Sequence, residues 1–92
     1  MVFPVYNVNF RKTHTNSILV SGEVVNESAK RYAVAMFKIL LFDRYHLLGS
    51  GIIKVNNFHP KAIRVFEVSI EDLSSKLIPS IARYEVLFEG GY

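Results

Sequence analysis

The three histidines are the side chains in this chain best suited to bind a metal ion. His14, His46 and His59 each stand in a separate polar stretch that is typical of a turn. A metal site built on them would need carboxylates at a ligand spacing, and none has that spacing from any of the three. Turns at one end of a fold can converge, but we interpret these histidines as exposed turn residues. We expect no metal and no cofactor.

The carboxylates closest to a catalytic arrangement are Asp43 and the adjacent pair Glu71 and Asp72. Asp43 begins a tight reversal, where a carboxylate usually accepts hydrogen bonds from turn amides. Glu71 and Asp72 suit the start of a helix, where negative charge complements the helix dipole. The chain has no cysteine, no glycine-rich phosphate loop and no Ser-His-Asp order. We therefore predict no catalytic residue and expect that the protein is not an enzyme.

The cations give a weak indication of an anionic partner. Eleven Lys and Arg residues oppose eight Asp and Glu residues, which leaves a net charge of +3. The densest cationic pairs are Arg11 with Lys12 and Lys30 with Arg31, each beside a predicted turn. A nucleic-acid interface needs clustered cations, so we expect these four to be solvated charges. A basic binder of nucleic acid or of an anionic surface remains the alternative function.

The elements that must position these residues are β-strands, because apolar side chains recur mostly at every second position. We predict strands near residues 4–12, 18–24, 32–43, 47–55, 62–70 and 83–89. A short helix is predicted near 71–78, where Leu73 and Leu77 share a helical face and Pro79 ends it. The fold class is therefore an all-β, antiparallel, immunoglobulin-like sandwich of six to seven strands, forming a single domain over residues 1–92.

The strand from Tyr32 to Asp43 is apolar on both of its side-chain rows. A strand that faces water on one side should alternate apolar and polar residues, so we expect its second face to be covered. One row contains the candidate interaction residues Val34, Met36, Leu40 and Phe42. A second copy of the chain, a partner protein or the 71–82 segment would cover them. Leu41, on the other row, and Phe66 are expected in the core.

Tyr84 follows Leu77 and Pro79 in an arrangement that resembles the tyrosine corner of Greek-key sandwiches. In such a corner the Tyr hydroxyl bonds to backbone upstream. We expect a structural role for Tyr84.

Four segments resemble the FxLYD domain family. Ile39–Asp43 is similar to its F-x-L-Y-D signature, and Gly22–Ser28 to its G-x-V-x-N-x-S strand and turn. Leu47–Gly49 looks like the hydrophobic-Leu-Gly step, and residues 58–68 resemble the L-x-P-G and F-x-V stretch, with Lys61 where the family has glycine. The water-stress and hypersensitive-response domain of late-embryogenesis proteins is a related pattern.

The resemblance implies an immunoglobulin-like sandwich without catalysis, of a kind common in bacterial and archaeal envelope or secreted proteins. No cationic stretch followed by an apolar run opens the chain, and no run of about eighteen apolar residues occurs. We expect a cytoplasmic protein if the chain is full length, and an envelope or secreted one if a leader was removed. The predicted function is a non-enzymatic structural or protein-interaction module that binds a protein partner or itself, and neither a nucleic acid nor a small-molecule substrate.

Overall fold

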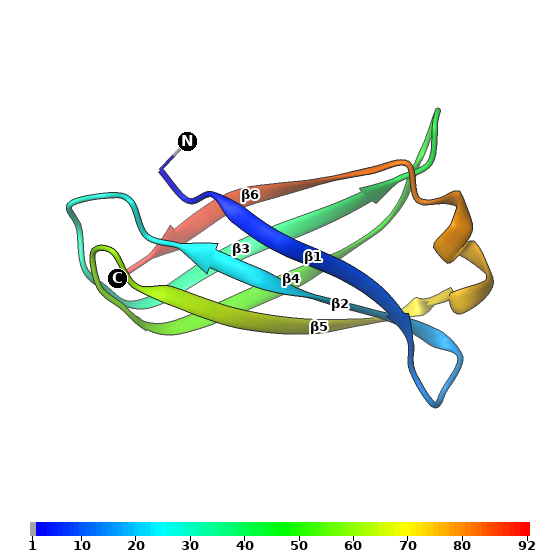
Figure 1. Ribbon diagram of the computed structural model, residues 1–92, viewed down its shortest axis with the longest axis horizontal. Helices are drawn as coiled ribbons and strands as arrows, with labels where there is room; N and C mark the ends of the chain where they lie inside the picture. The colour runs from blue at the N-terminus through cyan, green and yellow to red at the C-terminus, as the bar shows by residue number, and fades with distance from the viewer. Residues whose placement is uncertain (1) are drawn as a thin grey trace.

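A computed structural model describes residues 2–92 and folds them into two antiparallel three-stranded sheets packed face to face (Figure 1). Sheet A has the strand order β1-β2-β5, and sheet B has the order β4-β3-β6. In chain order the elements are β1 (Val5–Lys12), β2 (Ser17–Val25), β3 (Tyr32–Phe42), β4 (Leu47–Phe58), β5 (Ile63–Ser74), η1 (Ser75–Ser80) and β6 (Arg83–Gly91). The all-β sandwich predicted from the sequence is confirmed.

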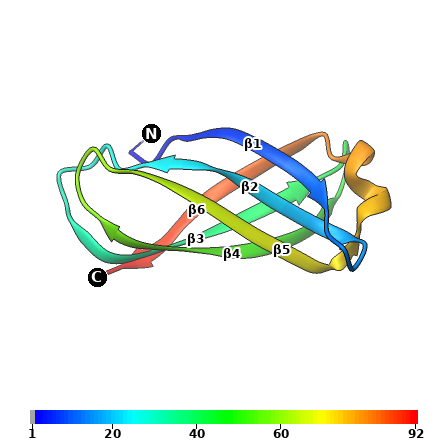
Figure 2. The same cartoon turned by 60° about the horizontal axis from the view of Figure 1, so that its bottom comes forward.

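The strand order is that of an immunoglobulin-like sandwich. Strands β1, β2 and β5 take the positions A, B and E, while β4, β3 and β6 take the positions C′, C and F. Figure 2 shows the two layers crossing over each other. In the complete arrangement a G strand pairs with the outer edge of F. Residues 2–92 place no strand there, so the outer edge of β6 has no strand partner within them.

The core lies between the sheets and is built from the inward rows that alternation predicts. Leu41 is fully buried and Phe66 is 5% exposed, so both predicted core positions are confirmed. A Cβ atom on Gly22 would lie 2.9 Å from the Phe66 ring, which explains why glycine interrupts β2 there. The largest fully buried side chains are Phe37, Phe58, Ile18, Ile39, Leu41, Ile70, Val20, Val24 and Asn26.

One short helix is present as predicted, but it begins at Ser75, four residues later than expected. Strand β5 continues to Ser74, which pairs with Ser17 of β2, and Leu73 is buried in the core. The sheet therefore holds residues 71–74 extended. Only a 3-10 helix follows, over Ser75–Ser80, with the Ser74 hydroxyl accepting a hydrogen bond from the Lys76 amide at 3.2 Å. It contains Pro79, whose missing N–H and fixed φ favour such a short turn over a longer helix.

Candidate functional site

The four candidate interaction residues lie together on the outer face of sheet B. Val34, Met36, Leu40 and Phe42 are all half-buried, because β3 is the central strand and has neighbours on both sides. Their cross-strand neighbours are mainly polar: Asn56 lies opposite Val34 and Lys54 opposite Met36. The Arg83 guanidinium lies 3.8 Å from the centre of the Phe42 ring. Lys38, which lies opposite Ile52 and Leu87, interrupts the row between Met36 and Leu40, so the four residues form a narrow, broken stripe.

Among the elements of residues 2–92, none packs over this stripe. The 71–82 segment does not cover it, because η1 packs at the end of the sandwich near β1, β2 and β5. The expectation that this segment covers β3 was therefore wrong. Burial by a second copy or a partner stays a prediction.

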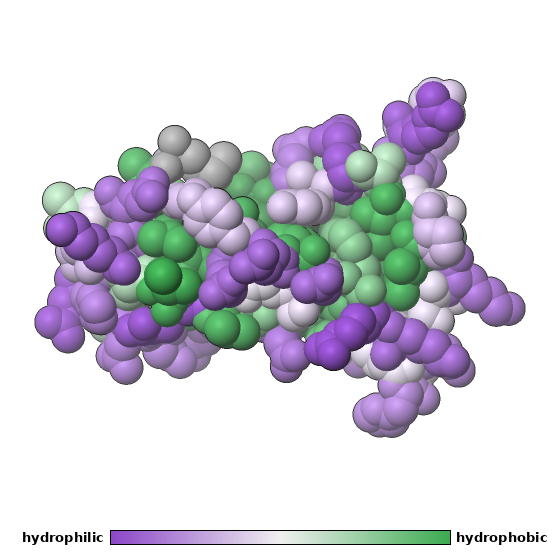
Figure 3. Space-filling model, in the orientation of Figure 1, coloured by the Kyte–Doolittle hydropathy of each residue, from purple (hydrophilic) through white to green (hydrophobic). Residues whose placement is uncertain are grey.

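The two long sides of the sandwich differ. On one side β4 and β5 lie close together, and a Cβ atom on Gly51 of β4 would come within 2.9 Å of the Val68 side chain of β5. On the other side run the edge strands β1 and β6, one from each sheet. Figure 3 shows apolar surface between polar side chains along the upper part of the molecule, where β1 and β6 run. The sandwich is closed on the β4–β5 side and open on the β1–β6 side.

The inward row of β6 is exposed at this open side. Tyr84, Val86 and Phe88 lie opposite the buried residues Leu41, Ile39 and Phe37 of β3, so they belong to the interior face of sheet B. Yet Tyr84 is 38% exposed and Phe88 39% exposed, whereas Ile39 and Leu41 are fully buried. The β6 row thus lacks the cover that its β3 neighbours have.

Two adjoining hollows lie along this row and share Val86. One has a volume of about 340 Å³ and is lined by Val5, Tyr84, Glu85, Val86 and Leu87. The other has a volume of about 240 Å³ and is lined by Val2, Phe3, Phe37, Val86 and Phe88. We call the two together the β6 hollow.

Aromatic contacts close the gap between the two layers at each end of the β6 hollow. At one end the ring centres of Phe3 and Phe88 are 4.7 Å apart, and Phe3 also contacts Phe37 at 5.4 Å. At the other end the rings of Phe10 and Tyr84 are 6.3 Å apart. The hollow is therefore bounded by fixed aromatic groups, with Val5 and Val86 between them.

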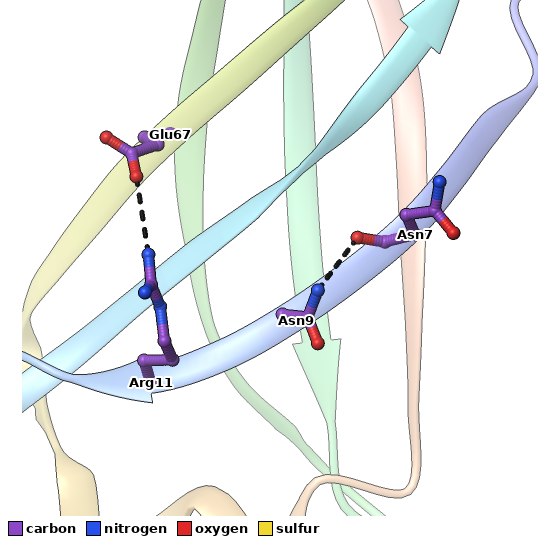
Figure 4. A network of polar contacts seen from close by, with 4 residues as sticks. All are labelled: Asn7, Asn9, Arg11 and Glu67. Carbon is purple, nitrogen blue, oxygen red and sulfur yellow. Dashed lines mark hydrogen bonds and ion pairs between the residues drawn. The ribbon is translucent and has the colours of Figure 1, made fainter.

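The edges of β1 and β6 differ in regularity. The register of β1 shifts between Tyr6 and Asn9, and Asn7 has a positive φ of 55°. In Figure 4 the Asn9 side chain donates to the Asn7 carbonyl, at 3.1 Å, within this bulge. A bulge protects a strand edge against further pairing. Strand β6 also has a register shift, between Phe88 and Gly90, but it keeps one register from Arg83 to Phe88, the part that lies beside the hollow. The regular free edge beside the hollow is therefore the edge of β6.

The four predicted basic residues are not brought together. Arg11 and Lys12 end β1, whereas Lys30 and Arg31 lie in the loop that follows the far end of β2. Arg11 also pairs with Glu67 of β5, at 3.5 Å across the outer face of sheet A (Figure 4). The four cations thus form no single patch, and binding to an anion by either pair stays a prediction.

The histidines are also separated. His14 lies in the β1–β2 turn, His46 in the β3–β4 turn and His59 in the β4–β5 turn, and all three are exposed. Within residues 2–92, no three His, Asp or Glu side chains gather in a way that could hold a metal ion.

Asp43 caps the β3–β4 turn, as the sequence predicts. Its carboxylate accepts hydrogen bonds from the backbone N–H groups of Tyr45, at 2.7 Å, and His46, at 2.6 Å. These bonds, that to Tyr45 first, hold the pKa of Asp43 below its usual value, and the nearby His46 side chain adds to this. A carboxylate engaged in this way positions the turn.

The lowered pKa of Asp43 predicts a specific loss of stability in acid. The unfolded chain binds a proton on Asp43 at a higher pH than the native chain does, so this contribution is present above a pH of about 4 and is lost below the native pKa. We expect urea midpoints to fall more for the wild type than for Asp43→Asn as the pH is lowered from neutral into this range. Parallel pH profiles for the two proteins would contradict the role of the charge.

Three further residues differ from their predicted roles. Glu71 lies in β5 instead of at a helix start, and its carboxylate accepts hydrogen bonds from the hydroxyls of Thr15 and Ser17 at 3.2 and 3.1 Å. Asp72 lies in β5 too, exposed. The Tyr84 hydroxyl makes no hydrogen bond to residues 2–92, so the tyrosine corner is not formed there; its ring instead faces Phe10.

Comparison with known proteins identifies no relative, so the function can be inferred only from the structure itself. No family model matches the chain, and neither a curated protein nor a solved structure is detectably similar to it. Membership of the FxLYD family stays a prediction. No helix within residues 2–92 has the length and apolarity that crossing a membrane requires.

Sequence reasoning missed the β6 hollow. It predicted the strand at 83–89 but assigned no site to it. The available signal was the alternation of Tyr84, Val86 and Phe88 in the last strand of a six-strand pattern. The sequence cannot show that this row is exposed. That requires knowing that β6 is an edge strand and that β1 leaves its inward row uncovered.

Proposed function

We propose that this protein is a non-enzymatic protein-interaction module that binds an extended strand along the free edge of β6. The observation that carries the proposal is the inward row of β6, where Tyr84 and Phe88 are exposed and Val86 is half-buried, beside an edge with no strand partner among residues 2–92. A strand added there takes its affinity from main-chain hydrogen bonds and its specificity from alternate side chains that enter the hollow.

The chemistry of the hollow defines the ligand. Its lining is mainly aliphatic and aromatic, with Glu85 as the one ionisable residue apart from Tyr84. Unpaired apolar surface of this kind is typical of a protein contact. The ligand is therefore an extended segment with apolar side chains at every second position. The predicted stripe on β3 lies on the opposite face of the same sheet and forms a separate, narrower surface.

A peptide titration followed by NMR tests this function. The probe is a short synthetic peptide with valine at alternate positions and threonine or lysine between them, added up to millimolar concentration to dilute protein. We expect the largest shifts in backbone amide resonances at residues 83–88, because the added strand would bond to that edge. A peptide of the same composition with its valines in one block is the control, since it cannot direct them all to one face.

Two variants sharpen the result. Val86→Thr places a hydroxyl in the hollow at nearly unchanged volume and should weaken peptide binding several-fold. Val65→Thr makes the same change on β5, where Val65 is 75% exposed and outside the hollow, and should leave binding unchanged. Equal shifts along the β5 and β6 edges, or no shifts at millimolar peptide, would remove the support for this function.

A further inference from the structure

The free edge of β6 is self-complementary. We propose that the strand bound there is β6 of a second copy, paired antiparallel about Val86 so that two sheets B join into one continuous six-stranded sheet. This inference rests on the proposed function, because it names the occupant of the same edge. Two-fold symmetric dimers are the commonest oligomers of identical chains, and such a dimer uses the same surface on both copies.

The side-chain rows restrict the register. Tyr84, Val86 and Phe88 face inward, while Arg83, Glu85 and Leu87 alternate with them, and Glu89 follows at the bulge where the register against β3 shifts between Phe88 and Gly90. A joined sheet must place inward residues opposite inward residues, because a slip by one position would turn one row toward solvent. The two-fold axis must therefore pass beside one residue of β6, which then lies opposite the same residue of the other copy. Near the middle of β6 this central residue can be Glu85, Val86 or Leu87.

Charge selects among these three registers. A centre at Glu85 would place the two Glu85 carboxylates directly opposite each other, and a centre at Leu87 would place Glu85 opposite Glu89. Directly opposed like charges destabilise a strand pair. A centre at Val86 instead brings Arg83, which pairs with Glu85 of its own chain, toward Glu89 at the bulge of the other copy, at both ends of the pair. Only this register is free of opposed like charges.

The inward row agrees with the same register. With Val86 at the centre, Tyr84 of one copy lies opposite Phe88 of the other, and aromatic cross-strand pairs are favourable. The second β6 would occupy the position of a G strand and bring its own inward row toward the side of the hollow lined by Val5. Each copy thereby covers the row that the other leaves exposed.

Sedimentation equilibrium and cysteine cross-linking test the proposal on the full chain, which has no cysteine of its own. We expect a monomer–dimer equilibrium that depends on concentration between the micromolar and millimolar ranges. Under mild oxidation, Val86→Cys should form a disulfide-linked dimer, because the two positions face each other. Leu87→Cys is the matched control: its two copies would be diagonal, roughly 7–8 Å apart, beyond the ordinary reach of a disulfide.

A charge exchange tests the register independently. Glu89→Arg should weaken the dimer about tenfold, because it places like charges at both ends of the pair, and adding Arg83→Glu should restore most of the loss. A strict monomer at millimolar concentration would refute the second copy as the occupant. Equal cross-linking of the two cysteine variants, or no recovery in the double variant, would refute the register. Peptide binding in a strictly monomeric protein would leave the interaction function standing and remove only the self-pairing.

Discussion

Replacing Leu41 by alanine should lower the free energy of unfolding by about 2–5 kcal/mol. The Leu41 side chain is fully buried in the inward row of β3, between the flanking strands β4 and β6. The substitution removes apolar contacts and leaves a cavity that a strand held on both sides cannot close. Domains of this size are typically stable by about 5–15 kcal/mol, so the loss would be a large share of the total. Urea denaturation followed by circular dichroism measures it.

The neighbouring residue provides the matched control. Leu40→Ala deletes the same atoms from the same strand, but Leu40 is half-buried on the outer face of sheet B, so we expect a cost of about 1 kcal/mol. The ratio between the two variants also reports on the outer stripe. Equal losses in a monomeric protein would mean that the two faces of β3 are equally covered, contrary to the structure. A cost for Leu40→Ala that grows with protein concentration would instead show that a second copy buries the stripe.

Local pattern was sufficient to predict most of the strands. Alternation fixes which residues share a row, so Leu41 and Phe66 were assigned to the core before any packing was known. The limit of this reasoning is the segment after Ile70. Leu73 and Leu77 have helical spacing, but Leu73 is buried in the sandwich and Ser74 pairs with β2. Pairing with β2 outweighed a helical preference that was only two turns long. Local sequence does not contain the information about this pairing.

The candidate site could not be predicted for a different reason. An exposed apolar row in β6 is defined by what fails to cover it, and that depends on the order of strands in both sheets. The row of Tyr84, Val86 and Phe88 has the same alternation as a fully buried strand. The stripe on β3 was found because it broke the expected alternation, whereas the β6 row obeyed it. Only the arrangement of sheets A and B separates a covered row from an open one.

Two residues in turns, Lys61 and Asn26, have conformations or surroundings that their residue types alone do not predict. Lys61 stands where the FxLYD pattern has glycine, and its φ of +68° is the left-handed conformation that glycine adopts without strain. Asn26, expected to end β2 in a turn, is fully buried, although asparagine is a residue usually found at the surface. The residue types Asn and Ser predict the turn, but the sequence does not show that the Asn26 side chain also reaches the Phe58 carbonyl at the end of β4.

Replacing Asn26 by alanine should destabilise the protein by about 2–4 kcal/mol, nearly as much as a core truncation. The Asn26 amide donates to the carbonyl groups of Lys30 and Phe58, each at 2.9 Å, and its oxygen accepts from the backbone N–H of Ser28 at 2.9 Å. Alanine would remove all three bonds: the Phe58 carbonyl would lose a buried bond, whereas the partly buried Lys30 carbonyl would keep the Ser28 hydroxyl as a donor at 3.3 Å. An unsatisfied buried group costs roughly 1–3 kcal/mol. Because Phe58 ends β4 and Lys30 precedes β3, the loss would loosen one end of the sandwich.

Two comparisons separate these hydrogen bonds from other effects. Asn56→Ala changes an exposed residue of the same type on β4 and should cost well under 1 kcal/mol. Asn26→Asp keeps the shape and the acceptor but cannot donate to either carbonyl when ionised, so at neutral pH it should be at least as unstable as Asn26→Ala. Hydrogen exchange should localise the damage to amides of residues 26–32 and 58–62. If Asn26→Asp were as stable as the wild type, the two donated bonds would contribute nothing, and the loops would be held by the bonds that remain, namely those from Ser28 to the side-chain oxygen and the backbone bonds of residue 26 with Ala62 and Lys61.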